Sequence, residues 1–256
     1  MSRSELSVCR AMGSIILLAF ILSTWWTGFN PVDVFLQLGE AWAFLSEDFW
    51  PPDLHYSEII VESIVVTLAL AVSSASVAAV LAAVAAIFGS EATSPSRGLA
   101  VIIRSFATFL RNIPTLVWAF ILFSSLGVGT GVGFTALCIT SFAFMTRTFI
   151  EVIDDIPGDT LESLEAVGAG FWERIFQCVL PMAVTEFISW YLYCLEVNIR
   201  ASTIVGMVGG GGIGMVLLSY LKEFRYPQAA GIILAIAVLV ILVDRLTDYL
   251  RKKAEA

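Results

Sequence analysis

The chain has 256 residues, of which 58% are hydrophobic and 14% are charged, and its mean hydropathy is +0.88. Soluble domains carry about a quarter charged residues, so this composition excludes a soluble globular protein and indicates an all-α integral membrane protein. A spanning helix needs about 20 apolar residues, so the length allows about six crossings and no large soluble domain, and the net charge of −8 is assigned to loops.

The first predicted span is residues 11–28, an uncharged run that ends just after the pair Trp25-Trp26. It has no clear small-x-small cleavage site, so we interpret it as a retained helix with an aromatic interfacial anchor rather than as a signal peptide. Residues 29–58 contain no Lys or Arg and are expected to form an external loop. The predicted organisation is therefore an N-terminal part, 1–58, and a transmembrane domain, 59–250.

The second span lies within residues 59–89, where an Ala-, Ser- and Val-rich half predicts close helix packing rather than lipid contact. Residues 112–146 are again uncharged, a stretch too long for one crossing and too short for two complete ones, so the segment before it must contribute. We therefore predict two helices, 99–126 and 130–147, separated by a glycine-rich turn.

The first of these two helices carries Arg104 and Arg111, which are seven residues apart and therefore share one helical face. Pro114 follows and is expected to bend the helix. We interpret the two arginines as interfacial anchors or helix–loop contacts, with a substrate role as the alternative.

The fifth span is predicted over residues 182–201 and the sixth over 227–243. Between them, 202–221 is apolar enough to cross, but its GGGGIG run favours a broken or re-entrant segment. Six crossings place both termini on one side, and the basic C-terminal tail assigns that side to the cytoplasm.

The polar loop 148–180 predicts a short helix over 159–168 on the cytoplasmic side. Asp159 followed by Glu162 is a capping-box-like start, and Gly168 permits a sharp exit. A partner protein could cover the apolar side of this helix, and an amphipathic loop on lipid headgroups is the alternative. That side would consist of Leu161, Leu164 and Val167.

The spacing of Glu162, Gly168 and the pair Leu180-Pro181 resembles the EAA loop of ABC importer permeases, although Ser163-Leu164 stands where that family commonly has Ala-Ala. The resemblance implies a type I (MetI-like) permease fold with six transmembrane helices and a cytoplasmic coupling helix that docks into the ATPase. The coupling residues that it implies are Glu162, Leu164, Glu165, Ala166, Gly168, Leu180 and Pro181.

Two further segments, RNIPTLVWA at 111–119 and EVNIRASTIVGMVGGGGIG at 196–214, resemble the phosphonate-type permease branch. Its members import phosphonates, phosphite or related oxyanions, while methionine and polar amino-acid permeases share part of the glycine-rich ending. The resemblance thus implies translocation of a small oxyanion, with an amino-acid ABC permease or a secondary transporter as alternatives. The candidate pathway or gate residues are Arg111, Asn112, Pro114, Glu196, Asn198, Arg200, Gly209, Gly210, Gly211 and Gly212.

Two of these features have alternative interpretations. Glu196 and Arg200 are one turn apart, so they either neutralise each other against another helix, or Arg200 faces the pathway beside Asn198 and meets the oxyanion. The glycine segment 209–212 either forms a flexible gate or lets helices or subunits approach closely.

The chain has no phosphate-loop motif, so it is not expected to bind ATP or to act as an enzyme alone. No catalytic residues, metal ligands or cofactor are predicted in it. The implied assembly lies in the bacterial cytoplasmic (inner) membrane, contacts lipid and no nucleic acid, and is a homodimer or a heterodimer with a paralogue. It includes two ATP-binding subunits, which bind ATP and Mg, and a periplasmic or lipid-anchored substrate-binding protein.

Overall fold

The computed structural model describes residues 3–53, 55 and 57–254, and within this part of the chain every regular element is helical. The chain divides into two units, Met1–Trp50 and Pro51–Ala256, which are described separately. The expected all-α fold class is confirmed.

The N-terminal unit contains α1 (Arg3–Thr27) and α2 (Pro31–Glu47). The first is apolar enough over 20 residues to cross a membrane, as predicted. The helix α2 corrects the expectation that residues 29–58 form a loop throughout. Asn30 caps α2 by accepting a hydrogen bond from the Val32 amide at 3.1 Å, and proline suits the first helical position because its missing N–H is not needed there.

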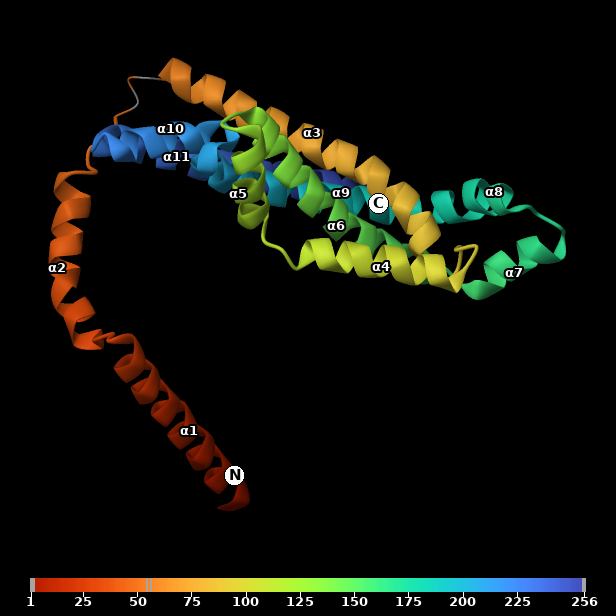
Figure 1. Ribbon diagram of the computed structural model, residues 1–256, viewed down its shortest axis with the longest axis horizontal. Helices are drawn as coiled ribbons and strands as arrows, with labels where there is room; N and C mark the ends of the chain where they lie inside the picture. The colour runs from red at the N-terminus through yellow and green to blue at the C-terminus, as the bar shows by residue number, and fades with distance from the viewer. Residues whose placement is uncertain (1–2, 54, 56, 255–256) are drawn as a thin grey trace. The chain divides into compact units, whose positions relative to one another are not determined.

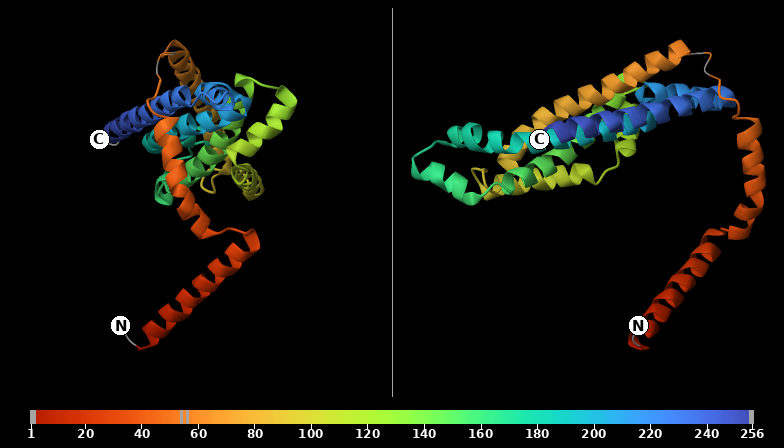
Figure 2. Two further views of the ribbon diagram at one scale, coloured as in Figure 1. Left: turned by 90° about the vertical axis from the view of Figure 1, so that its left-hand side faces the viewer. Right: turned by 180° about the vertical axis from the view of Figure 1, so that it is seen from behind.

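The second unit is built on four long helices, α3 (Ser57–Gly89), α6 (Thr130–Asp154), α9 (Leu180–Val205) and α11 (Tyr226–Ala254), which run side by side in both views (Figures 1 and 2). Small residues on α3 permit close approach to its neighbours, which confirms the packing expected for this helix. The fully buried alanines of α3 are Ala71, Ala75, Ala78, Ala82 and Ala86.

Pro114 breaks the predicted 99–126 helix into α4 (Arg97–Arg111) and α5 (Thr115–Leu126), which meet at an angle of 85°. Proline lacks an amide donor and clashes with the preceding turn, and it also disfavours helical geometry in the residue before it. Within the described residues, five helices are long and apolar enough to span a membrane, and the bent pair makes up to six. The expected six crossings require that α4 and α5 count as one broken span.

The glycine-rich segment is broken, as predicted. After α9 the chain forms a π-helical turn, η2 (Gly206–Gly210), which leaves helical geometry at Val208 and Gly209, the latter with φ of +96°. A ten-residue helix, α10 (Ile213–Lys222), then leads to α11. At about 1.5 Å per residue α10 is only about 15 Å long, half of a bilayer's apolar thickness.

The loop between α6 and α9 folds into a hairpin that extends beyond one end of the bundle (Figures 1 and 2). Its arms are α7 (Gly158–Ala166) and α8 (Phe171–Arg174). A π-helical turn, η1 (Ile175–Val179), joins α8 to α9 without a break in the helical path. We call residues 158–174 the α7–α8 hairpin.

Candidate functional site

The α4–α5 break, α6 and α9 enclose a pocket of about 250 Å³. Three residues predicted for the pathway, Arg111, Pro114 and Asn198, line it together although they come from separate segments. We call this the Arg111 pocket. Its other polar lining residues are Thr115, Thr140, Ser141, Tyr193 and Cys194.

Arg111 is the cation of this pocket. It ends α4, is exposed, and places its guanidinium carbon 5.9 Å from the ring centroid of Phe144 on α6. Among the described residues no ion pair involves it. Its planar set of N–H donors can therefore meet an anion that enters the pocket. Asn112 is the exposed C-cap of α4 and is not among the residues that line the pocket.

Asn198 lines the Arg111 pocket, but its side-chain amide is bonded to neighbouring helices. Only 3% of it is exposed, and its amide nitrogen donates to Ser141 Oγ at 2.7 Å and to Ser74 Oγ at 3.3 Å. These bonds join α9 to α6 and α3, so they satisfy a buried polar group inside the bundle. The amide is therefore engaged with neighbouring helices rather than free in the pocket.

Arg200 lies in a different environment from Asn198. Its Nη2 is 3.0 Å from Glu196 Oε1 and 3.6 Å from Asp244 Oδ1 on α11. This placement favours the mutually neutralising interpretation and adds a second carboxylate that sequence spacing missed. Asp244 is distant in the chain, and only the packing of α11 on α9 brings it to Arg200.

The segment Gly209–Gly212 is packed against α3, α5 and α6. The Gly129 amide donates to the Gly209 carbonyl at 2.9 Å, and a Cβ on Gly209 would lie 3.0 Å from the Phe123 ring. A Cβ on Gly210 would lie 2.6 Å from a Val205 methyl, and one on Gly211 3.0 Å from a Thr130 methyl. A Cβ on Gly212 would overlap Thr67 of α3, and Gly209, Gly211 and Gly212 all have positive φ. Close packing and left-handed backbone geometry together therefore account for glycine at these positions.

The exit of α7 requires a glycine. Gly168 has φ of +84°, its amide donates to the Glu165 carbonyl at 2.9 Å, and the Ala169 amide donates to the Leu164 carbonyl at 3.0 Å. This is a Schellman motif, which ends a helix with one residue in the left-handed region. The predicted sharp exit is confirmed.

The start of α7 differs from the predicted capping box. The helix begins at Gly158 after Pro157, without a side-chain cap, and Asp159 lies inside its first turn. Because the N-cap position is Pro157, Asp159 lies two positions too late in the chain to serve as the cap.

The predicted apolar side of α7 is divided between two environments. Leu161 is buried, and Leu164 packs on the same core of the bundle, whereas Val167 is 79% exposed. Leu161 and Leu164 thus face the chain's own core, and Val167 lies beyond the last helical residue. The hypothesis that all three face a partner is therefore wrong for the buried Leu161, and the half-buried Leu164 also packs on this core rather than standing free for a partner.

The exposed surface of the α7–α8 hairpin includes the predicted coupling residues Glu162, Glu165 and Ala166. Glu165 pairs with Arg174 across the hairpin, and the Gly170 amide donates to Glu173 Oε2 at 2.6 Å. The ion pair joins the two arms, and the hydrogen bond caps the start of α8. Sequence reasoning missed Glu173 and Arg174, although glycine followed three residues later by glutamate is a helix-start signal. Leu180 and Pro181 begin α9, where proline fits the first turn.

Comparison with known proteins identifies the family. Residues 75–255 match the family model for binding-protein-dependent transport system inner membrane components. The chain is 29% identical to the phosphite transport system permease protein PtxC of Stutzerimonas stutzeri, over 95% of this chain and 89% of that protein. It is 30% identical to the phosphate-import permease protein PhnE of Mycolicibacterium smegmatis, over 73% of this chain and 35% of that protein.

A solved chain of the MetNI methionine ABC transporter, in an inward-facing conformation, has the same fold. Its TM-score is 0.69 at 17% identity, with 79% of this chain and 99% of that chain covered. The family model, the apolar helices and the shared fold all indicate a membrane-embedded transport component. The chain therefore belongs to the binding-protein-dependent transport system inner membrane components and is a permease component of an ABC importer.

Proposed function

We propose that this permease carries a small phosphorus oxyanion of the phosphite, phosphonate or phosphate class. The observation that carries the proposal is the guanidinium of Arg111, which lines a pocket formed by three segments of the bundle and has no carboxylate partner among the described residues. Arginine suits a tetrahedral oxyanion because it can donate two parallel hydrogen bonds. Relatives named for phosphite and phosphate transport support the same class of cargo.

The energy for transport is proposed to come from separate subunits. No phosphate-loop motif occurs in the sequence, so ATP and Mg would be bound by two partner ATPase subunits. The α7–α8 hairpin would dock on an ATPase subunit through its exposed surface, which includes Ala166 and Val167. A second copy of this chain, or a paralogue, would complete the pathway, and a separate binding protein would deliver the cargo.

Transport of an oxyanion can be measured directly. In proteoliposomes that contain the complete importer and internal ATP, we expect uptake of phosphite, methylphosphonate or phosphate and no uptake of methionine. Arg111→Gln should reduce this uptake at least tenfold, because it removes the cation of the pocket. Arg97→Gln, an exposed position at the other end of α4, is the control and should transport normally. Uptake of methionine without any oxyanion would reject the proposed cargo.

Both termini are proposed to be cytoplasmic, with 29–58 outside, because the basic C-terminal tail favours the cytoplasm and 29–58 lacks Lys and Arg. In a background without the four native cysteines, Ser46→Cys should react with an impermeant thiol reagent in intact cells. Ala254→Cys should react only after the membrane is opened. The reversed labelling pattern would contradict this topology while leaving the family assignment in place.

A further inference from the structure

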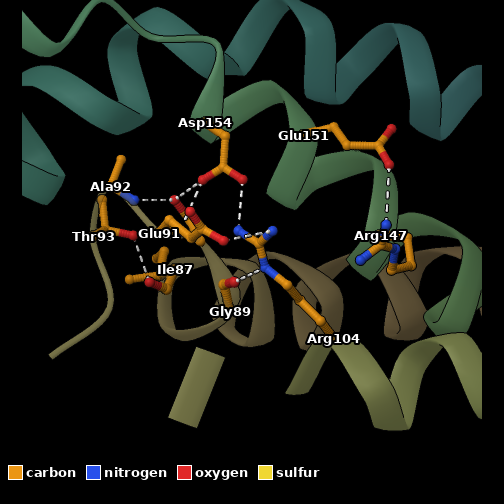
Figure 3. Close-up of polar contacts among 10 residues, drawn as sticks. Ile87, Gly89, Glu91, Ala92, Thr93, Arg104, Arg147, Glu151 and Asp154 are labelled. Carbon is orange, nitrogen blue, oxygen red and sulfur yellow. Dashed lines mark hydrogen bonds and ion pairs between the residues drawn. The ribbon is translucent and has the colours of Figure 1, made fainter. Parts of the chain in front are cut away.

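A cluster of charged and backbone groups joins α3, α4 and α6 at the end of the bundle that carries the α7–α8 hairpin (Figures 1 and 3). The Arg104 guanidinium lies at its centre (Figure 3). Its Nη2 donates to Asp154 Oδ2 at 2.7 Å, and its Nε donates to the Gly89 carbonyl at 2.7 Å. Its Nη1 lies 3.5 Å from Glu91 Oε1. One side chain of α4 therefore holds the end of α3, the following turn and the end of α6.

Both carboxylate oxygens of Asp154 accept hydrogen bonds. While Oδ2 accepts from Arg104, Oδ1 accepts from Ser90 Oγ at 2.6 Å and from the Glu91 amide at 2.9 Å. The Arg104 and Asp154 side chains are only 23% and 28% exposed. Hydrogen bonds between charged groups are about twice as strong as neutral ones, so this contact is a firm link between α4 and α6.

The link lies directly beside the α7–α8 hairpin. Asp154 is the last residue of α6, and α7 begins at Gly158. Between them Ile156 is buried in the same core cluster as Ile153 and Leu161. Because this short connection is packed rather than free, a displacement of α7 would also move Asp154.

From Arg104 the helix α4 leads straight to the Arg111 pocket. The two arginines are seven residues apart, which corresponds to about 10.5 Å along an α-helix. The helix α4 ends at Arg111, and the chain bends by 85° into α5, so the pocket lies at the bend between the two helices. The single helix α4 thus connects Arg104, which is bonded to α3 and α6, with Arg111 in the pocket.

We propose that Arg104 is a positioning residue that transmits movement of the α7–α8 hairpin through Asp154 and α4 to the Arg111 pocket. This inference rests on the proposed coupling role of the hairpin and adds the route by which ATP-driven motion reaches the cargo. Arg104 touches no cargo on this route. It acts by keeping α4 attached to the end of α6.

The test separates ATP hydrolysis from uptake in the complete importer. In Arg104→Gln we expect basal ATP hydrolysis within twofold of the wild type, uptake reduced at least tenfold, and no stimulation of hydrolysis by the loaded binding protein. Arg147→Gln is the matched control, because Arg147 pairs at 3.5 Å with Glu151 on its own helix (Figure 3). That ion pair joins no second element, so its loss should leave uptake and stimulation within twofold.

Asp154→Asn is a second variant with nearly unchanged shape. It removes the charge that Arg104 meets and keeps an oxygen for Ser90 and the Glu91 amide, so it should uncouple hydrolysis from uptake in the same way. Normal uptake in both variants would overturn the proposal. So would a parallel fall of uptake, hydrolysis and melting temperature, or a failure of both variants to accumulate in the membrane, because the cluster would then serve folding alone. Absence of oxyanion uptake in the wild type would instead contradict the proposed function.

Discussion

Gly168→Val is expected to abolish uptake while the permease still accumulates in the membrane. Gly168 has φ of +84°, and a left-handed conformation costs an L-residue about 1–2 kcal/mol, with a β-branched side chain among the worst tolerated. No atom lies within 4 Å of the added Cβ, so the penalty comes from the backbone and not from a clash. The hydrogen bonds that the Glu165 and Leu164 carbonyls accept in the Schellman motif would be lost, and the α7–α8 hairpin would lose the shape on which its proposed docking depends.

The same hairpin offers a matched control. Gly158→Val adds the same atoms at a position that also has open space but does not have positive φ. It should retain at least half of the wild-type uptake and should co-purify with the ATPase subunit. Gly168→Asn should fall between the two valine variants, because asparagine tolerates the left-handed region. Normal transport by Gly168→Val would show that the shape of the hairpin is unimportant for transport and would reject the proposed coupling role.

Gly133→Val is expected to prevent accumulation of a stable permease. A Cβ on Gly133 of α6 would overlap the carbonyl oxygen of Gly210, and this backbone neighbour cannot rotate away. Overpacking of a tight core typically costs about 1–3 kcal/mol, and a backbone contact belongs at the upper end of that range. The measurement is the amount of protein in membranes together with its melting temperature in detergent.

Gly131→Val provides the comparison within α6. Gly131 is exposed, and no atom lies within 4 Å of an added Cβ. Its replacement should leave both the amount of protein and the melting temperature close to those of the wild type. An equally stable Gly133→Val protein would mean that α6 and the Gly209–Gly212 segment do not pack as described, and the gate interpretation of these glycines would then gain support.

Several features of the fold followed from local sequence alone. Long uncharged runs predicted the apolar helices because an uncompensated charge in lipid is expensive. Pro114 predicted the bend after α4, and GGGGIG predicted the break after α9, because both act on the backbone of their own segment. The helix α2 was missed although the pair Asn30-Pro31 carried a readable start signal.

The placement of the charged side chains depended on tertiary packing. Sequence spacing paired Arg200 with Glu196, one turn away, but the approach of Asp244 depends on how α11 lies on α9. In the same way, the partners of Arg104 lie at the ends of other helices, and no short-range pattern connects them to it.

The sequence by itself determined which segments are long and apolar enough to span a membrane, where the chain breaks at Pro114 and at the glycine run, and which permease family the chain resembles. These properties depend on hydropathy, backbone chemistry and local spacing. Only the tertiary structure decided that Leu161 faces the chain's own core, that Asn198 joins three helices and that Arg111 lines a pocket. Helical periodicity identifies residues that share a face, whereas the neighbour of that face is set by the packing of segments distant in the chain.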